Sequence, residues 1–276
     1  MPMIVAKRPK REGRLDRLDD PIDYARIATP IGASATRYPD GYEIPPHAHG
    51  RDQLLHAISG VMRVTTPMEA WIVPPDRAVY IPAGVRHTVR MHGDVEMRPL
   101  YIVADAGEAD RPAERALGVV GVSDLLRALI LVLADADPGA ADDPRIPLVT
   151  ELVRLELDRA RRLRLNLPLP RDPRLQRVCA ALLADPANDG ALEDWAAEAG
   201  AAPRTLARLF RQELGMTFGD WRRRVRFHAA LEDLSRGRPI AQVAARAGYR
   251  SASAFTAAFG RAMGFRPSRL PDGERR

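Results

Sequence analysis

The feature that most constrains the fold is a pattern of small, glycine and aromatic residues that occurs twice in the last third of the chain. The first copy begins at Trp195 and reads WAAEAGAAPRTLARLF; the second begins at Val243 and reads VAARAGYRSASAFTAAF. In each copy a small residue four positions before the glycine lets two helices approach closely, and the glycine permits a left-handed turn between them. Gly200 and Gly248 lie 48 residues apart. Two copies in register predict two helix-turn-helix units, over residues 191–212 and 239–261.

Between the two copies, residues 217–235 follow a helical pattern with their apolar side chains broadly on one face. A helix of this length spans about 28 Å at about 1.5 Å per residue. Successive major-groove faces of a DNA duplex lie about 34 Å apart. A rigid spacer of this length can therefore hold two helices in adjacent grooves. The arginines of its WRRRVR run form either a solvated helix face or contacts to a DNA backbone.

Positive charge is concentrated in the same part of the chain. From Asp172 to the end there are 18 arginines, no lysine and 12 acidic residues, whereas the residues before it carry equal numbers of basic and acidic groups. The whole net charge of +6 therefore lies with the repeated pattern. This distribution favours an anionic partner such as a nucleic acid.

The repeated pattern, the spacer and the closing GFRPSRL segment resemble the DNA-binding domain of the AraC/XylS family of transcription regulators. The resemblance covers residues 172–270, and Leu270 stands where the family signature has an aromatic residue. It implies that double-stranded promoter DNA is a partner and that the second helix of each unit lies in a major groove.

In such units base edges are read by the exposed, N-terminal side of the second helix. In the first unit this places Arg204, Thr205 and Arg208 at the groove, and the resemblance assigns base readout to the positions of Arg204, Ala207 and Arg208. The guanidinium groups of these two arginines can donate hydrogen bonds to guanine O6 and N7. The matching face of the second unit is small and weakly polar, so we expect the first helix to read sequence and the second mainly to dock on phosphates. The residues expected at DNA in the second unit are Arg250, Ser251, Ala252, Ser253 and Thr256.

Residues 25–105 follow a different pattern. Short apolar or alternating runs, among them LLHAIS, AWIVP and HTVRM, are separated by proline, glycine and aspartate. About seven strands spaced in this way predict an antiparallel sandwich or small barrel. His47 and His49 are two positions apart, so on a strand both point to one face. With His87 from a later hairpin, their imidazoles could converge on Zn, Fe, Ni, Cu or Mn.

The segments around these histidines resemble the two motifs of the cupin family. The first motif matches throughout, except that Gln53 replaces its glutamate. The second keeps its proline, glycine and histidine but has Asp76 for the leading glycine and Met91 for the asparagine. Two interpretations stay open: the site binds a divalent transition metal, or its side chains line and brace a pocket for a small effector. The site residues are His47, His49, Gln53 and His87.

The remaining segments complete the predicted organisation. Residues 118–135 are apolar over more than one face, so a helix there needs cover from the barrel or from its copy in a second subunit. Residues 146–163 predict an amphipathic helix. Three prolines in the LNLPLPRDP stretch mark a domain boundary, because proline cannot continue a helix. We expect a flexible arm (1–24), a cupin-like domain (25–105), a helical linker or dimerisation region (115–165) and a DNA-binding domain (172–270).

The expected location is the cytoplasm. The one cysteine, Cys179, lies among apolar residues at helical spacing, which favours core packing in a reducing compartment. Neither a signal peptide nor a membrane span is expected, because no apolar run is long enough.

Together these patterns predict an α+β multidomain protein that is not an enzyme and that regulates transcription as a homodimer in response to a small molecule or metal. RNA polymerase is a further expected partner. The alternative is a metal-dependent cupin enzyme with a helical appendage. Against it, Gln53 is neutral, and no second carboxylate is available to act as a general acid or base. A helical protein-interaction module would leave the concentration of positive charge unexplained.

Overall fold

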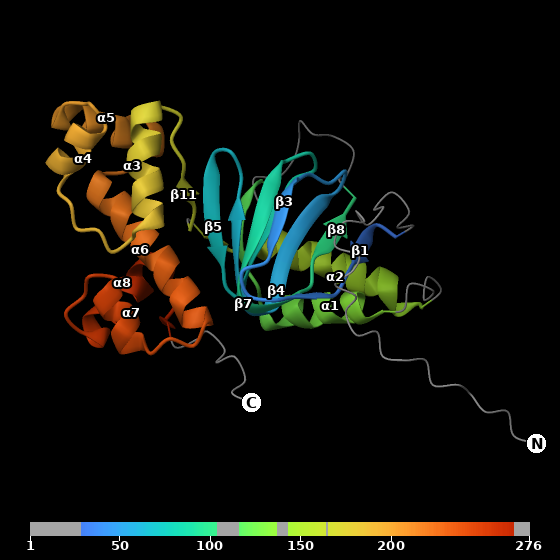
Figure 1. The fold of residues 1–276 in the computed structure, drawn as a ribbon. Coiled ribbons are helices and arrows are strands. Elements are labelled where there is room, and N and C mark those ends of the chain that lie inside the picture. The colour runs from blue at the N-terminus through green and yellow to red at the C-terminus, as the bar shows by residue number, and fades with distance from the viewer. Residues whose placement is uncertain (1–28, 104–115, 137–142, 164, 268–276) are drawn as a thin grey trace, which may run out of the picture.

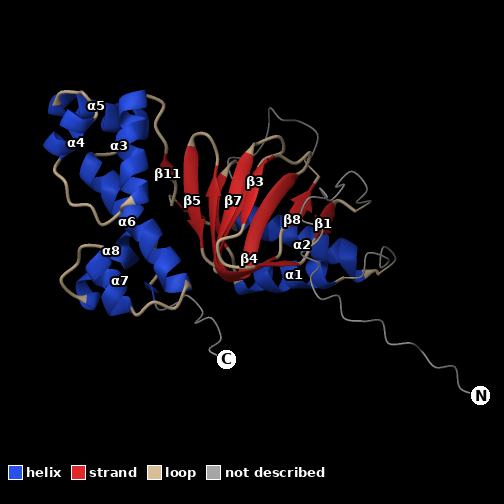
Figure 2. Cartoon of the chain, viewed as in Figure 1, coloured by secondary structure: helices blue, strands red, loops and turns tan. Residues whose placement is uncertain are grey.

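The protein has a β-rich half followed by an all-helical half, with two further helices packed beside the sheet (Figures 1 and 2). The structure, a computed structural model, describes residues 29–103, 116–136, 143–163 and 165–267. The arm expected over residues 1–24 and Leu270 lie outside these ranges. The predicted α+β multidomain class is confirmed.

Antiparallel strands build the first half. Among the described residues eleven strands pair with one another, and the 14-residue strand β4 connects two faces of the sheet. The first part of β4 pairs with β6 and β8, and its second part pairs with β5 and β7. The strands are β1 (Ile31–Ala33), β2 (Thr36–Tyr38), β3 (Glu43–His47), β4 (Asp52–Thr65), β5 (Glu69–Val73), β6 (Arg77–Ile81), β7 (His87–Met97), β8 (Leu100–Ile102), β9 (Gly118–Gly121), β10 (Arg162–Leu163) and β11 (Leu167–Pro168).

Strand β4 changes partners between His56 and Ala57. Its register with β7 shifts between Ala57 and Ser59 and again between Ser59 and Val61, and Gly60 within the second shift has a φ of +70°. A Cβ there would lie 2.7 Å from the backbone oxygen of Asp94, so only glycine fits the turn without displacement. Leu55, before Gly60, and Met62, after it, enter the same core, while Leu54 points into another.

Three strands lie beyond the expected end of the barrel at residue 105. The helix predicted from Gly118 is wrong for its first residues, because Val119 and Val120 are buried in β9 between β6 and β10. Ser123 then caps α1 (Asp124–Asp135) by accepting a hydrogen bond from Leu126 N at 3.0 Å. Helix α2 (Arg145–Arg159) ends four residues before the expected Leu163, which pairs in β10.

The proline-rich boundary is held against the barrel. Strand β11 pairs with β5, and both Leu165 and Leu167 are buried. The segment therefore joins the two halves as part of the sheet edge, where proline is tolerated.

Six helices form the described part of the second half: α3 (Pro173–Ala184), α4 (Leu192–Glu198), α5 (Pro203–Leu214), α6 (Phe218–Ser235), α7 (Ile240–Arg246) and α8 (Ala252–Met263). The predicted spacer is confirmed as α6, with Thr217 accepting a capping hydrogen bond from Asp220 N. Cys179 is buried in α3, and burial raises the pKa of its thiol. Within the described ranges, every helix is too short or too polar to span a bilayer.

Candidate functional site

The first helical unit consists of α4, a tight turn and α5. Ala196 and Ala199 are buried where the helices meet, so the small side chains allow close packing. Gly200 adopts a φ of +66°, which a residue with a side chain rarely adopts. Leu206 and Phe210 bury the inner face of α5. The predicted helix-turn-helix geometry is therefore present.

The outer face of α5 carries the arginines expected to read bases. Arg204 and Arg208 are exposed, while Thr205 and Ala207 are half-buried. Arg208 Nη1 donates to Gln212 Oε1 at 2.6 Å. Residues four apart share one helix face, so Gln212 holds the guanidinium on the same side as Arg204. Gln212 is not among the predicted residues, although its spacing of four from Arg208 is the signal that could have identified it.

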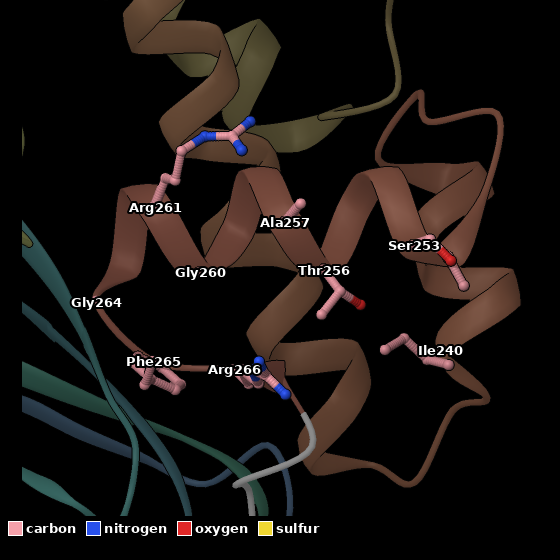
Figure 3. A pocket seen from close by; sticks show the side chains of 10 residues that line it. Ile240, Ser253, Thr256, Ala257, Gly260, Arg261, Gly264, Phe265 and Arg266 are labelled. Atoms are coloured by element: carbon pink, nitrogen blue, oxygen red, sulfur yellow. The ribbon is translucent and has the colours of Figure 1, made fainter.

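The second unit, α7 and α8, has the same turn at Gly248, with a φ of +82°. Ser251 caps α8 by accepting a hydrogen bond from Ala254 N at 3.1 Å, so it has a structural role besides the phosphate contact expected of it. A groove runs along this helix (Figure 3). Its lining includes the expected DNA residues Ala252, Ser253 and Thr256, together with Ile240, Phe265 and Arg266. Arg250 is exposed on the turn beside it.

The arginine run on α6 mainly braces the fold. Arg226 donates to the backbone oxygens of Pro186 and Asn188 and pairs with Asp189. Arg222 donates to Gly190 O at 2.8 Å, and Arg224 donates to Asn166 O at 2.5 Å. These three arginines therefore form neither a solvated helix face nor contacts to a DNA backbone, because their guanidinium groups bond to the neighbouring loops.

The three cupin-like histidines converge at one end of the barrel. His47 ends β3 and pairs in register with His87, the first residue of β7. His49 lies just beyond β3 instead of on the strand, but one ring nitrogen from each of the three lies within 4.8 Å of the others. Ring centroids are 4.3 Å apart for His47 and His87. The predicted convergence is therefore present, on the described residues.

Backbone carbonyls orient two of these rings. His47 Nδ1 lies 2.8 Å from Pro45 O, and His87 Nδ1 lies 3.0 Å from Val85 O. With Nδ1 donating its proton, Nε2 carries the lone pair that a metal needs, which is the arrangement of metal-binding histidines in general. His87 Nε2 is buried and makes no hydrogen bond within the described residues. These donors fit a divalent transition metal.

His49 and His87 are neutral at cellular pH. Burial first, then the neighbouring His47 and His87, lowers the pKa of His49 to about 4. Burial also lowers the pKa of His87 to about 4, against the opposing effect of its hydrogen bond to Val85. A neutral imidazole can ligate a metal or accept a hydrogen bond from an effector.

Gln53 lies beside this cluster on β4, with its amide orientation fixed by Tyr101. Gln53 Nε2 donates to the Tyr101 hydroxyl at 3.2 Å, and its Oε1 is buried without a hydrogen bond among the described residues. The Tyr101 ring also packs edge-on against His49, with centroids 5.3 Å apart. Tyr101 was absent from the expected site because it comes from β8, far from both motifs in sequence.

Comparison with known families gives two matches. The family model of a helix-turn-helix domain matches residues 195–272, and that of a cupin domain matches residues 35–103. The HTH-type transcriptional regulator NimR of Escherichia coli K12 is 31% identical over 225 residues, which cover 82% of this chain and 81% of NimR. The HTH-type transcriptional regulator RipA of Corynebacterium glutamicum is 34% identical over 107 residues, 39% of this chain and 32% of RipA.

Similar solved structures include the C-terminal domain of AraT, a response regulator from Geobacillus stearothermophilus. It is 32% identical, with 36% of this chain and 84% of that chain covered and a TM-score of 0.33. ToxT from Vibrio cholerae is 11% identical, with 87% of this chain and 97% of that chain covered and a TM-score of 0.36. Scores this low support no statement about this chain.

A cupin domain joined to paired helix-turn-helix units, with a regulator as a relative over most of the chain, defines a DNA-binding transcription regulator and not an enzyme. The chain belongs to the AraC/XylS family of these regulators.

Proposed function

We propose that this regulator reads its promoter mainly through α5 and responds to a ligand held by the cupin-like histidines. The observation that carries the proposal is the convergence of three imidazoles in a barrel that is packed against a DNA-binding half. A ligand changes DNA binding only if it prefers one of two arrangements of the protein.

The proposed DNA contacts are unequal. Each guanidinium group of Arg204 and Arg208 can make two hydrogen bonds to one guanine. A good bidentate contact of this kind discriminates against the wrong base by about 1 to 3 kcal/mol. The α8 face offers Ala252, Ser253 and Thr256, which can meet thymine methyls or make single hydrogen bonds. Ser251 and Arg250, at the start of α8, are proposed to contact phosphates.

The proposed ligand is a divalent transition metal, or a small effector bound in its place. His47, His49 and His87 would hold the metal through nitrogen, and Gln53 would add a neutral oxygen. When bound, the metal supplies a cationic centre that orders these side chains and anchors a ligand; the neutral protein donors leave its charge uncompensated. The effector interpretation uses the same imidazoles as hydrogen-bond partners.

A second copy of the chain is the proposed partner at α1 and α2. Leu148, Leu152 and Leu155 form a stripe on α2 at helical spacing and are 68%, 42% and 47% exposed. Leu125 and Val132 on the neighbouring helix α1 are also exposed. An apolar stripe on two packed helices is the kind of surface that dimers bury. We also propose RNA polymerase as a partner and the cytoplasm as the location, because a promoter-bound regulator works beside both.

The test combines metal analysis with footprinting. Full-length protein purified without an affinity tag is assayed for bound metal and then used to footprint the promoter next to its own gene, with and without added Zn²⁺ or Ni²⁺. The proposal expects about one metal per chain and a change in protection when it binds. Substoichiometric metal after supplementation would reject the metal interpretation and leave the effector interpretation, which a promoter-fusion screen of small molecules then tests.

A further inference from the structure

Two connections carry the histidine cluster at its end of the barrel. Residues 48–51 join β3 to β4 and include His49, and residues 82–86 join β6 to β7 and lead into His87. The ring nitrogens of the cluster converge to within 4.8 Å. Imidazole nitrogens that both carry lone pairs do not attract each other. Their places must therefore be fixed by the backbone of these two connections.

Asp52 joins the two connections. It opens β4 directly after the first connection, and it is only 2% exposed. Its Oδ1 accepts a hydrogen bond from Ala83 N at 2.8 Å, and its Oδ2 accepts one from the Tyr80 hydroxyl at 2.6 Å. Hydrogen bonds to a charged acceptor are roughly twice as strong as those between neutral groups. One carboxylate thus holds both the end of β6 and the connection that follows it.

A second hydrogen bond joins the same connections beside Asp52. Gly84 N donates to His49 O at 2.9 Å. The consecutive amides of Ala83 and Gly84 therefore bond to the two ends of the segment from His49 to Asp52. Gly84 has a φ of +78°, which suits the third position of a tight turn. The turn is fixed against the segment that carries His49.

This turn carries the carbonyl that orients His87. Val85 O lies 3.0 Å from His87 Nδ1, and Val85 N donates to Pro82 O at 3.2 Å, which closes the turn. Val85 is two residues beyond Ala83, so a displacement of the Ala83 amide is passed to this carbonyl. His87 Nε2, the nitrogen left for a ligand, is buried and makes no hydrogen bond in the described part of the chain. The hydrogen bond at Asp52 thereby bears on the direction of this nitrogen.

The Asp52 carboxylate itself lies on the other side of the sheet from the ligand atoms. Successive side chains of a strand point to opposite faces, so Asp52 and Gln53 diverge. Gln53 donates to Tyr101, whose ring packs against His49. Asp52 instead accepts from Tyr80, which belongs to the apolar cluster shared with α1. Asp52 is therefore outside the group of converging ligand atoms and acts through the backbone.

We propose that Asp52 is a positioning residue of the ligand site: its carboxylate holds the 82–86 connection and so sets the place and the tautomer of His87. The proposal rests on the proposed ligand binding by the three histidines. It adds a residue at a position that the cupin-like motif leaves open. Partners outside the ligand set typically change metal affinity by about 10- to 100-fold.

Titration with Co²⁺ measures the effect, because the visible absorption of this ion reports both affinity and coordination geometry. Full-length protein is purified without a tag and stripped with a chelator. We expect about 10- to 100-fold weaker binding and a changed absorption band in Asp52→Ala. Asp52→Asn should lose less, because its amide can still accept from Ala83 N while donating to the Tyr80 hydroxyl.

Val120→Ala separates positioning from a general loss of stability. Val120 is buried on β9, and its truncation leaves the hydrogen bonds of Asp52 in place. Thermal unfolding should show a less stable barrel, while Co²⁺ affinity and spectrum stay those of the original protein. Unchanged Co²⁺ binding in Asp52→Ala would overturn the proposal. Equal weakening in Asp52→Ala and Val120→Ala would overturn it too.

A second variant keeps the proposal testable if Asp52→Ala does not fold. Ala83→Pro removes the amide that donates to Asp52, and proline suits the second position of a turn with this glycine. The turn is kept and only its attachment is lost. We expect weaker Co²⁺ binding by Ala83→Pro. Affinity equal to that of the original protein would show that the turn needs no hold from Asp52.

A measurement without metal distinguishes failure of this proposal from failure of the proposed metal binding. If the original protein binds no Co²⁺, the metal interpretation is rejected, and the ring ¹⁵N shifts of His87 then decide on Asp52. These shifts, assigned with a His87→Gln variant, report which nitrogen carries the proton. We expect Nδ1–H in the original protein and a mixture of tautomers in Asp52→Ala. The same single tautomer in both proteins would contradict the role of Asp52.

Discussion

Arg208 is the residue on which the proposed sequence reading by α5 depends most. Its guanidinium is exposed and donates to Gln212, so it would reach DNA from a defined position. We predict that Arg208→Ala costs roughly 1 to 3 kcal/mol on the preferred duplex and much less on a scrambled one. Fluorescence anisotropy with both duplexes measures this difference.

The matched control for this change is Arg223→Ala. Arg223 is an exposed arginine on α6 that pairs with Asp220, and its loss removes the same charge. We expect it to affect both duplexes equally. If Arg208→Ala also weakens both equally, base readout by Arg208 is refuted.

Gln53 is proposed to determine how strongly the barrel site can hold a metal. A carboxylate at this buried position would add a negative ligand to three neutral imidazoles, and divalent cations prefer charged oxygen to an amide. We predict at least tenfold tighter Zn²⁺ or Ni²⁺ binding by Gln53→Glu and weaker binding by Gln53→Leu, measured by calorimetry. Identical affinities for all three proteins would place the metal elsewhere or nowhere.

His228 gives the folded state a pH dependence. It is fully buried on α6, and burial, then Arg63 and Arg224, lowers its pKa to about 3 from an ordinary value of 6.5. Between these values the unfolded chain binds a proton that the folded chain does not. The contribution of His228 to the free energy of unfolding is therefore complete above pH 6.5. As the pH falls below this value, the contribution is lost by at most about 1.4 kcal/mol per pH unit.

Replacing His228 with leucine should remove this part of the pH dependence. Urea unfolding of both proteins with a chelator present, at pH 7 and pH 5, gives the comparison. We expect the free energy of unfolding to fall less between these values in His228→Leu than in the original protein. An equal fall in both would assign the dependence to other groups.

The residues that sequence could identify are those whose spacing is local. His47, His49 and His87 follow motif spacing, and the structure brings them together. Tyr101 and Gln212 were not predicted. Tyr101 reaches the site only through the pairing of β8 with β4, which no local pattern encodes.

At the scale of elements, helices with local signals were the most predictable. Pro173 opens α3 after the capping Asp172, and Thr217 caps α6, so both helices begin where the sequence indicates. Residues 118–121 were assigned to a helix because they are apolar. They form β9 because β6 and β10 offer partners on both sides, and this long-range pairing outweighs the local pattern.

The α1 and α2 stripe gives a prediction about assembly. A charge placed among exposed leucines should prevent a second copy from docking there, because burying it costs several kcal/mol. We predict that Leu148→Glu lowers the dimer fraction at least tenfold in sedimentation equilibrium. Met68→Glu, at a 40% exposed barrel position, is the control and should leave association unchanged. A dimer that tolerates Leu148→Glu would rule out this face.

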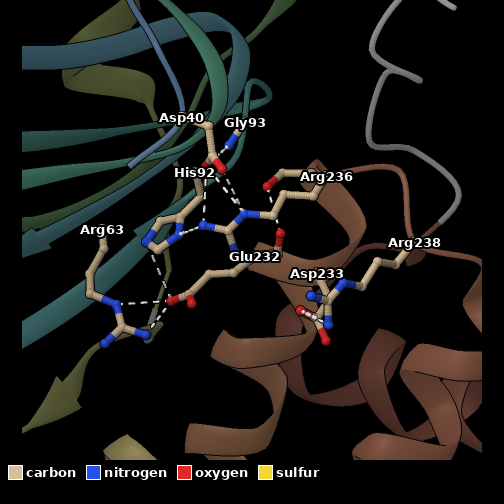
Figure 4. A network of polar contacts seen from close by, with 9 residues as sticks. Asp40, Arg63, His92, Gly93, Glu232, Asp233, Arg236 and Arg238 are labelled. Atoms are coloured by element: carbon tan, nitrogen blue, oxygen red, sulfur yellow. Dashed lines mark hydrogen bonds and ion pairs between the residues drawn. The ribbon is translucent and has the colours of Figure 1, made fainter. Parts of the chain in front are cut away.

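At the scale of the whole molecule, the two halves pack directly against each other and are not joined by the connecting segment alone. The barrel core and the second helical unit belong to one apolar cluster, and Arg63 of the barrel donates a hydrogen bond to Glu232 near the end of α6 (Figure 4). The sequence indicated two domains and their order. It held no signal for their contact, because Asp40 and Arg236 are 196 residues apart and neither lies in a motif.

The central claim is that two helix-turn-helix units bind one promoter unequally, with α5 as the reader. Footprinting of full-length protein on the promoter next to its own gene tests this most directly, with Arg208→Ala and Ser253→Ala in parallel. The account predicts two protected segments about one helical turn apart, with specific protection lost in Arg208→Ala and largely kept in Ser253→Ala. Protection that survives Arg208→Ala but disappears in Ser253→Ala would contradict it.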